Sequence, residues 1–210
     1  MAVARSNDPL QKLQKEYPEQ VKPLVGDLAD FSIGKKAVDL AKSTWNRLDG
    51  LIVNHGVLNP VKRIADANAE DWRECFDINV FSAVAIIKEA LPSLRHSKGK
   101  IILVSSGAAV SAYATWGAYG ASKSVLNHIA LTLAAEEPAV TSISIRPGIV
   151  DTGMQRELRE IYNTVMDKKD AEKFASLKAD GKLLKPEQPG HVIAKLSLDG
   201  PKDLSGQFLK

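Results

Sequence analysis

Short apolar runs rich in β-branched residues alternate along the chain with longer stretches of helical period. The apolar runs predict strands at Val21–Gly26, Gly50–Asn54, Lys100–Ser105, Thr141–Arg146 and Gly206–Leu209. The longer stretches predict helices at Gly34–Asn46, Asn68–Arg95, Ala118–Glu136 and Met154–Asp180. Strands that alternate with helices indicate a parallel sheet with helices on both faces. We therefore expect a doubly wound α/β fold, with the mainly apolar run KIILVS near the centre of its sheet.

Composition and charge indicate a globular protein and argue against several classes of partner. The 210 residues suit one domain, 1–210, and the 44% hydrophobic and 25% charged residues are typical of soluble globular proteins. A net charge of +3 without a basic block argues against nucleic-acid or membrane-surface binding. The single cysteine, Cys75, excludes an internal disulfide and suits a reducing compartment. Because the chain shows neither a secretory signal nor a long apolar run, we expect a cytoplasmic protein.

Ligands of doubly wound sheets bind beyond the carboxyl ends of the strands, so the residues that follow each run are the candidates for a site. These are Asp27, the tripeptide 54–56, the tripeptide 105–107 and the segment 147–152. Three of these four places carry a glycine, which lets the backbone turn sharply or approach a ligand closely.

Tyr119 and Lys123 stand four residues apart at the start of a predicted helix, so both lie on one face. A tyrosine with a pKa of about 10 is a poor acid at neutral pH, but a nearby ammonium stabilises the phenolate and lowers that pKa. By itself the pair is explained more simply as an exposed Tyr and Lys. Ser106, thirteen residues before Tyr119, either holds a carbonyl oxygen beside the phenol or caps the following turn, as Ser105 also could.

Asn79 interrupts a helical stripe of apolar residues that runs from Trp72 to Ala90. A buried amide is costly unless its donors and acceptors are paired. The pattern leaves two interpretations open: Asn79 ties two core elements together, or it serves the site formed by the other polar residues.

The segment VSSGAAVSAYATWGAYGASKSVLNHIALTLAAE resembles the serine–tyrosine–lysine segment of the short-chain dehydrogenases/reductases, which have a Rossmann-like fold. The resemblance implies that Ser106 binds the substrate oxygen and that Tyr119 transfers the proton. It implies that Lys123 lowers the pKa of Tyr119 and contacts the nicotinamide ribose. The segment FDINVFSAV resembles the family's fourth catalytic position, so that Asn79 would support a water chain to the lysine.

Further strand ends resemble the family's cofactor-binding positions. GLIVNHGV is similar to the strand-four N-A-G signature around the adenine ribose, which implies that Asn54 and Gly56 contact the cofactor. His55 replaces the alanine there, and we interpret it as a structural variant. Asp27 in LVGDLAD matches the aspartate that frames the adenine. RPGIVDTGM matches the segment that holds the nicotinamide carboxamide, with the positions Pro147, Val150 and Thr152.

The resemblance also implies a cofactor preference. Arg5 and Ser6 follow what resembles the end of the family's second strand, near the adenosine 2′ position. NAD-selective sites place an acidic residue there, whereas an arginine accommodates a 2′-phosphate. We therefore expect NADP(H), the alternative being that Arg5 belongs to a frayed terminus.

The sequence departs from the family in one respect, because it contains no T-G-x-x-x-G-x-G loop. Met1 falls inside the expected second strand, so the fold should lack the first strand and helix, about 30 residues. In the family's strand order, 3-2-1-4-5-6-7, this removes a central strand and leaves two unpaired edges facing each other. Two interpretations compete: a shortened form of a complete enzyme, which the retained catalytic set favours, or an inactive remnant that acts as an interaction module.

The expected activity is reversible hydride transfer between NADP(H) and a carbonyl/alcohol pair. The segments around Tyr119 most resemble the fungal sepiapterin-reductase-like and benzil-reductase-like members, which suggests a small ketone or diketone substrate. Substrate choice should reside in Gly153–Lys185 with Tyr113 and Trp116, although the charged pattern of Met154–Asp180 equally fits a solvated surface. By family analogy we expect a homodimer that pairs through Asn68–Arg95 and Ala118–Glu136.

Overall fold

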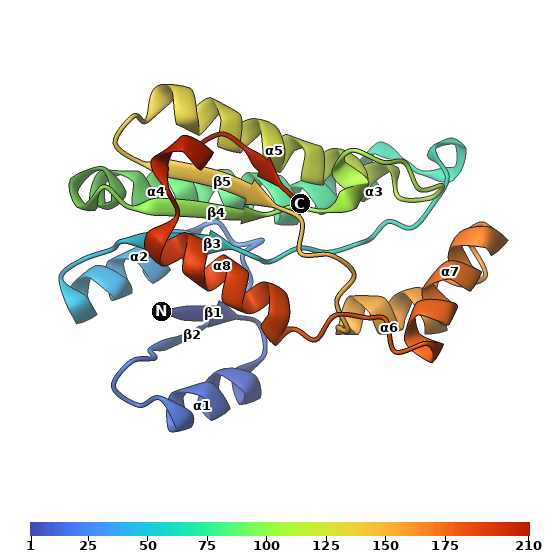
Figure 1. Ribbon diagram of the computed structural model, residues 1–210, viewed down its shortest axis with the longest axis horizontal. Coiled ribbons are helices and arrows are strands. Elements are labelled where there is room, and N and C mark those ends of the chain that lie inside the picture. Colours follow the sequence, from blue (N-terminus) through green and yellow to red (C-terminus); the bar gives the residue numbers. More distant parts are fainter.

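The computed structural model describes residues 1–210 and contains parallel strands flanked by helices (Figure 1). One sheet pairs β1 with β2, and the other has the order β3-β4-β5-β6. Every pairing within both sheets is parallel. The strands are β1 (Ala2–Ala4), β2 (Pro23–Val25), β3 (Gly50–Val53), β4 (Lys100–Val104), β5 (Thr141–Ile145) and β6 (Phe208–Leu209). The five strands predicted from apolar runs all occur, and each is shorter than the run that predicted it.

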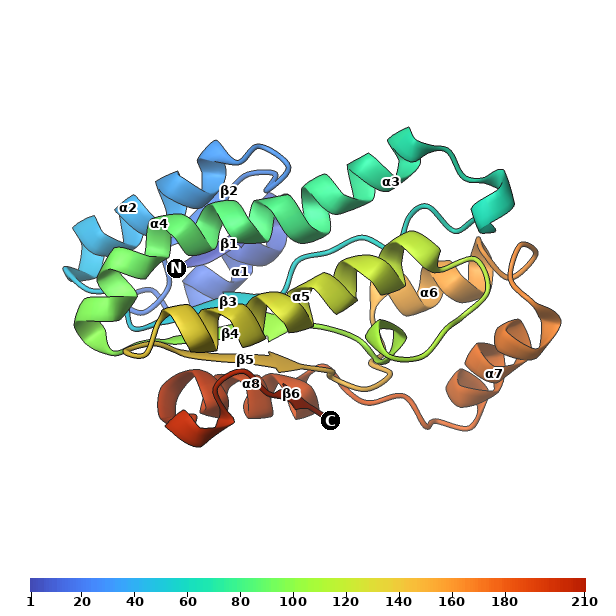
Figure 2. The same cartoon turned by 90° about the horizontal axis from the view of Figure 1, so that it is seen from above.

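Helices cover both faces of the four-stranded sheet, which confirms the doubly wound α/β prediction. The helices are α1 (Asn7–Glu16), α2 (Ser32–Trp45), α3 (Ala69–Phe76), α4 (Ser82–Ser97), α5 (Gly117–Glu136), α6 (Gly153–Glu160), α7 (Lys168–Ala179) and α8 (Glu187–Asp199). The view from above shows α4 and α5 along one face and α8 on the other (Figure 2). None of these helices has the length and apolar character that crossing a membrane requires.

The central strand β4 explains where the core lies. Its residues Ile101 and Leu103 point toward α4 and α5, where they pack with Leu126 in the larger apolar cluster. Ile102 points to the opposite face and packs with Ile143 of β5 near α8. Both faces of β4 are therefore buried, and full burial of one such side chain stabilises the fold by about 1.5–3 kcal/mol. This burial accounts for the nearly continuous apolar run in the sequence.

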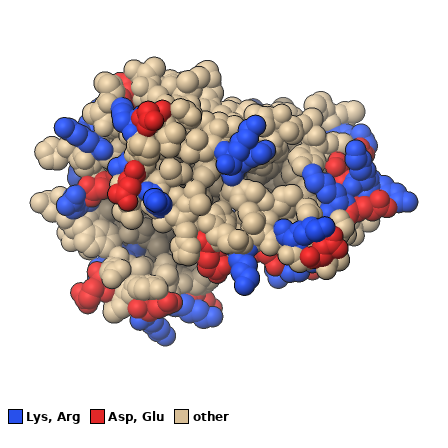
Figure 3. Space-filling model, viewed as in Figure 1, with Lys and Arg blue, Asp and Glu red and all other residues tan.

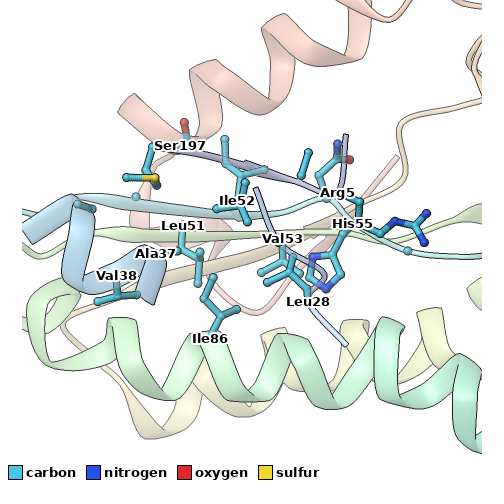
Figure 4. A pocket seen from close by; sticks show the side chains of 18 of the residues that line it. Arg5, Leu28, Ala37, Val38, Leu51, Ile52, Val53, His55, Ile86 and Ser197 are labelled. Carbon is cyan, nitrogen blue, oxygen red and sulfur yellow. The ribbon is translucent and has the colours of Figure 1, made fainter. Parts of the chain in front are cut away.

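The two sheets do not join. No hydrogen bonds connect β1 with β3, and a cavity of about 670 Å³ lies between them. Its walls are largely apolar and come from α2 on one side and α8 on the other, with Val38 and Ile52 among the lining residues (Figure 4). The sequence prediction of two unpaired edges facing each other is confirmed.

The predicted helix Asn68–Arg95 is interrupted. Between α3 and α4 the chain forms a π-helical turn, Asp77–Phe81, and α4 then continues to Ser97. Asn68 begins α3 as expected, because its side chain accepts a hydrogen bond of 2.8 Å from the Asp71 N–H. The π turn inserts one extra residue into the helical ladder, a feature common at functional sites, and Asn79 lies within it.

The prediction of one helix over Met154–Asp180 is wrong. The structure has α6 and α7 there, because the intervening segment bends so that Met166 joins the apolar cluster of Leu158 and Phe174. Helices α1 and α8 were not predicted at all. Each carries a proline in its first turn, Pro9 and Pro189, where proline is tolerated although it usually marks a loop.

On the face shown in Figure 3, charged side chains do not gather into a patch of one sign. Lysines and arginines are interspersed with acidic residues, and they are densest at the end formed by α6 and α7. Several pairs are bonded there, including Lys178 with Asp151 at 2.6 Å.

Candidate active site

Tyr119 and Lys123 lie in the first turns of α5 and are both buried. The Lys123 Nζ lies 5.8 Å from the centre of the Tyr119 ring. It donates a hydrogen bond of 2.9 Å to the backbone carbonyl of Val104, the last residue of β4. The helical spacing thus brings the two side chains together at the carboxyl end of the central strand, where the sequence places them.

Ser106 follows β4 and lines a second cavity together with Tyr119 and Lys123. Its Oγ accepts a hydrogen bond of 3.1 Å from the Ala108 N–H and so caps the 3₁₀ turn Gly107–Ala109. The capping interpretation is therefore confirmed, but capping uses only an oxygen lone pair. The hydroxyl proton remains available to donate to a ligand oxygen. Ser105 is committed elsewhere, since its hydroxyl donates to the Lys123 backbone carbonyl at 3.1 Å.

Burial is the main cause of the pKa shifts of both Tyr119 and Lys123. Burial raises the pKa of Tyr119, and the Ser106 hydroxyl acts in the opposite direction. Burial lowers the pKa of Lys123 to about 8. The Lys123 Nζ is directed to the Val104 carbonyl, and its expected part in lowering the pKa of Tyr119 stays a prediction. Because burial raises its pKa, Tyr119 carries its proton at neutral pH.

Asn79 is 1% exposed, and its amide is paired with protein groups. Its Oδ1 accepts from the Val57 N–H at 2.8 Å, while its Nδ2 donates to the Val57 carbonyl at 2.9 Å and to the Ser122 Oγ at 3.0 Å. These contacts tie the π turn to the segment after β3 and to α5. The interpretation of Asn79 as a tie between core elements is confirmed, and its part in a proton route stays a prediction.

Gly56 separates Asn79 from Lys123. A Cβ at this position would lie 3.2 Å from the Asn79 Oδ1 and 3.2 Å from the Lys123 Nζ, which is tighter than most real contacts. Only a glycine lets the backbone pass between the two side chains without displacing one of them.

His55 belongs to the framework, as the sequence interpretation held. Its Nε2 lies 2.6 Å from the Ser82 Oγ, and the Ser82 hydroxyl donates to the Ile78 carbonyl at 2.5 Å. Since the serine proton is used there, we assign the proton of the imidazole to Nε2. Burial, together with the charge of Lys123, lowers the pKa of His55 to about 4, so the ring is neutral.

The predicted cofactor residues line two cavities that meet at the carboxyl ends of the strands. Asn54 and Gly56 line both cavities. The cavity between β1 and β3 adds Arg5, Ser6 and Asp27. The second cavity, of about 880 Å³, adds Ser106, Tyr119, Lys123, Pro147, Val150 and Thr152.

For three of these predicted cofactor residues, local hydrogen bonds show which polar groups are already used and which are free. Asp27 accepts a hydrogen bond of 3.0 Å from the Ala29 N–H and so caps its own turn. Val150 pairs with Leu184 through hydrogen bonds of its neighbours, the Ile149 carbonyl and the Asp151 N–H, so its own amide points away from that bridge. Thr152 begins α6 without a capping bond from its side chain, which leaves its hydroxyl free for a ligand.

Several residues that line the second cavity were not named from the sequence, among them Met154, Leu158 and Phe174. Phe174 of α7 is 2% exposed and stacks on Trp116, with ring centres 5.5 Å apart and planes at 16°. The charged pattern of this stretch is also typical of a solvated surface, so it identifies no pocket residue. A single aromatic residue within KKDAEKFASLKAD was the signal that could have identified Phe174.

Comparison with known proteins identifies the family of the chain. The short chain dehydrogenase family matches residues 1–163. The uncharacterized oxidoreductase YIR035C of Saccharomyces cerevisiae is 41% identical over 209 residues, covering 99% of this chain and 82% of that protein. The benzil reductase ((S)-benzoin forming) IRC24 of the same yeast is 41% identical over 219 residues, covering 99% and 83%.

Solved structures show the same fold. The crystal structure of the KRED1-Pglu enzyme is 38% identical and superimposes with a TM-score of 0.96, covering 99% of this chain and 87% of that one. The crystal structure of YIR035C gives the same TM-score of 0.96 at 41% identity, covering 99% and 83%. The family match and these identities, over nearly the whole chain, show that the protein belongs to the short-chain dehydrogenase/reductase family of oxidoreductases.

Proposed function

We propose that the protein reduces a carbonyl compound, a ketone or diketone, with NADP(H) as the hydride source, and catalyses the reverse oxidation of the alcohol. The observation that carries this proposal is the convergence of Ser106, Tyr119 and Lys123 on one cavity. Asn54 and Gly56 line both this cavity and the one that Arg5 lines. The similarity to a benzil reductase supports a carbonyl substrate.

The hydrogen-bond donors that line the two cavities suit the two ends of a nicotinamide dinucleotide, its carboxamide and its 2′-phosphate. The free amide of Val150 and the uncapped hydroxyl of Thr152 suit a carboxamide, and the exposed guanidinium of Arg5 suits a 2′-phosphate. Gly56 lines the cavity beside Lys123 and presents no side chain to a ribose there. For the pyrophosphate, the sequence contains no glycine-rich loop. When bound, the cofactor supplies a hydride to the carbonyl carbon.

The residues of the chain then act on the carbonyl oxygen. Ser106 donates its free hydroxyl proton to that oxygen in a hydrogen bond and so positions it. Tyr119, protonated because burial raises its pKa, transfers its phenol proton to the same oxygen as negative charge develops there. Lys123, with a pKa of about 8, is largely cationic at neutral pH and stabilises the phenolate that remains. Asn79 keeps the start of α5 in register with the segment after β3.

Replacing Tyr119 by phenylalanine tests the assignment of the proton donor. Tyr119→Phe keeps the ring in the core and removes the proton, so kcat for a diketone should fall by about a hundredfold or more. The affinity for NADPH, followed by fluorescence titration, should stay nearly unchanged. Tyr17→Phe, on an exposed tyrosine, is the matched control and should behave like the wild type. A Tyr119→Phe protein that reduces the diketone at the wild-type rate would contradict the assignment.

The cofactor preference has its own test. Arg5→Asp should weaken NADPH binding about ten- to a hundredfold and improve NADH relative to it, since a charge-assisted bond to phosphate is lost. An unchanged ratio of the two affinities would remove Arg5 from the site. A wild-type chain that binds neither cofactor and reduces no carbonyl would instead favour the interaction module.

A further inference from the structure

Three aromatic rings form one wall of the cavity beside the proposed proton donor. The rings of Tyr113 and Trp116 have centres 4.6 Å apart, and Trp116 stacks on Phe174 at 5.5 Å. The Tyr119 ring meets Trp116 edge-on at 5.9 Å, with planes at 88°. We call Tyr113, Trp116 and Phe174 the aromatic wall. Because the wall begins in contact with Tyr119, a group attached to the reacting carbonyl carbon would lie within its reach.

Two segments distant in sequence build this wall, and specific contacts hold them together. Tyr113 and Trp116 precede α5, whereas Phe174 belongs to α7. The Lys173 Nζ donates a hydrogen bond of 2.8 Å to the Tyr113 Oη and lies 4.9 Å from the centre of that ring. Leu158 of α6 belongs to the same cluster. The rings are therefore held in position by neighbours, which is the condition for a selective surface.

Two kinds of residue line the cavity. Ser106, Lys123 and Arg146 supply polar groups, and no aspartate or glutamate lines the cavity. The aromatic wall, with Met154 and Leu158, supplies apolar surface. A volume of about 880 Å³ lies within the range of roughly 300–1,000 Å³ usual for small-molecule sites. The cavity thus suits a molecule that carries both a carbonyl oxygen and an apolar group.

We propose that the substrate is an aryl ketone whose ring packs against the aromatic wall, and that Phe174 and Tyr113 determine this preference. The proposal rests on the proposed function for the place of the carbonyl oxygen. Aromatic rings attract one another beyond the gain from buried area, through the charge distribution of their faces and edges. That attraction corresponds to about a two- to tenfold preference for a phenyl over a saturated ring of similar size.

Two ketones that differ only in the ring test the proposal. Acetophenone and cyclohexyl methyl ketone share one carbon skeleton, and their dissociation constants for the protein are measured by ligand-observed NMR, which requires no turnover. The wild type should bind acetophenone about two- to tenfold more tightly. Phe174→Leu and Tyr113→Leu should each bring the two constants close to equality while leaving the cyclohexyl ketone nearly unaffected. Tyr113 is only partly buried, so its variant should fold even if loss of the buried Phe174 ring destabilises α7.

Phe31→Leu is the matched control, because Phe31 is 44% exposed and lines neither cavity. It should keep the phenyl preference of the wild type. Equal binding of the two ketones by the wild type, or a preference that survives in both wall variants, would overturn the proposal. If the phenyl preference is present but neither ketone is reduced with NADPH or NADH, the aryl site stands and the proposed function fails.

Discussion

The half of the molecule built on β3 to β6 and the half built on β1 and β2 differ in how they are supported. In the first, β4 has neighbours on both edges and helices on both faces, and Ile101, Ile102 and Leu103 are fully buried. In the second, each strand has three residues and one partner strand, and no residue of either strand is buried. Only Leu10 of α1 is buried against this small sheet.

The residues proposed to carry out the reaction lie on the well-packed half, whereas two residues proposed to bind the cofactor lie on the weakly packed half. Ser106, Tyr119 and Lys123 are anchored to β4 and α5, whose contacts place their atoms closely. Arg5 and Asp27 stand at the ends of β1 and β2, on a unit with few buried contacts. Because local stability follows buried contacts and protected hydrogen bonds, the β1–β2 unit should open at lower free energy than the catalytic half.

Filling the space between β1 and β3 should have the largest effect. A strand, glycine-rich loop and helix fused ahead of Met1 would pair with both edges and occupy the cavity. Burial of a few apolar side chains at about 1.5–3 kcal/mol each should raise the free energy of unfolding by on the order of 5 kcal/mol. NADPH at a hundred times its Kd should add about 2.7 kcal/mol, measured by chemical denaturation with and without ligand.

The unfused chain should show a smaller shift with NADPH under the same conditions, because it has no glycine-rich loop to bind the pyrophosphate. A fusion whose strand has prolines at alternate positions cannot pair with both edges and serves as the control. Tight NADPH binding by the unfused chain would show that the glycine-rich loop is not needed for this site.

A pair of leucine substitutions compares the two halves directly. Leu126 of α5 is fully buried in the larger cluster, whereas Leu24 of β2 is only partly buried. Leu126→Ala should cost about 2–5 kcal/mol in the free energy of unfolding, and Leu24→Ala about 1 kcal/mol or less. Hydrogen exchange should show faster opening of the β1–β2 amides in the Leu24 variant alone. Equal costs at the two positions would mean that both halves unfold as one cooperative unit.

His55, which lines the cavity between the halves, should give the smallest effect. Its pKa is lowered from 6.5 to about 4 in the folded state, so the unfolded chain takes up a proton first as the pH falls. The free energy of unfolding should therefore decrease between pH 6.5 and about 4, by roughly 1–3 kcal/mol, and level off below. His55→Ala should flatten this part of the curve, measured by urea denaturation across the range. Unaltered pH dependence in the variant would assign the acid sensitivity to other groups.

The sequence by itself determined the features that depend on local spacing. The spacing of four from Tyr119 to Lys123 places both on one helical face, and alternation of strands and helices brings the strand ends to one edge of the sheet. The gap beside β3 was also predictable, because the family resemblance supplied the strand order in which a central member is missing.

Only the tertiary structure decided the features that depend on which distant groups meet. Phe174 joins the aromatic wall because the chain bends between α6 and α7, and no local pattern encodes that bend. Burial raises the pKa of Tyr119, and the direction of the Lys123 Nζ depends on the packing around Val104. Spacing determines which side chains share a face, whereas burial and the partners of each polar atom follow from long-range packing alone.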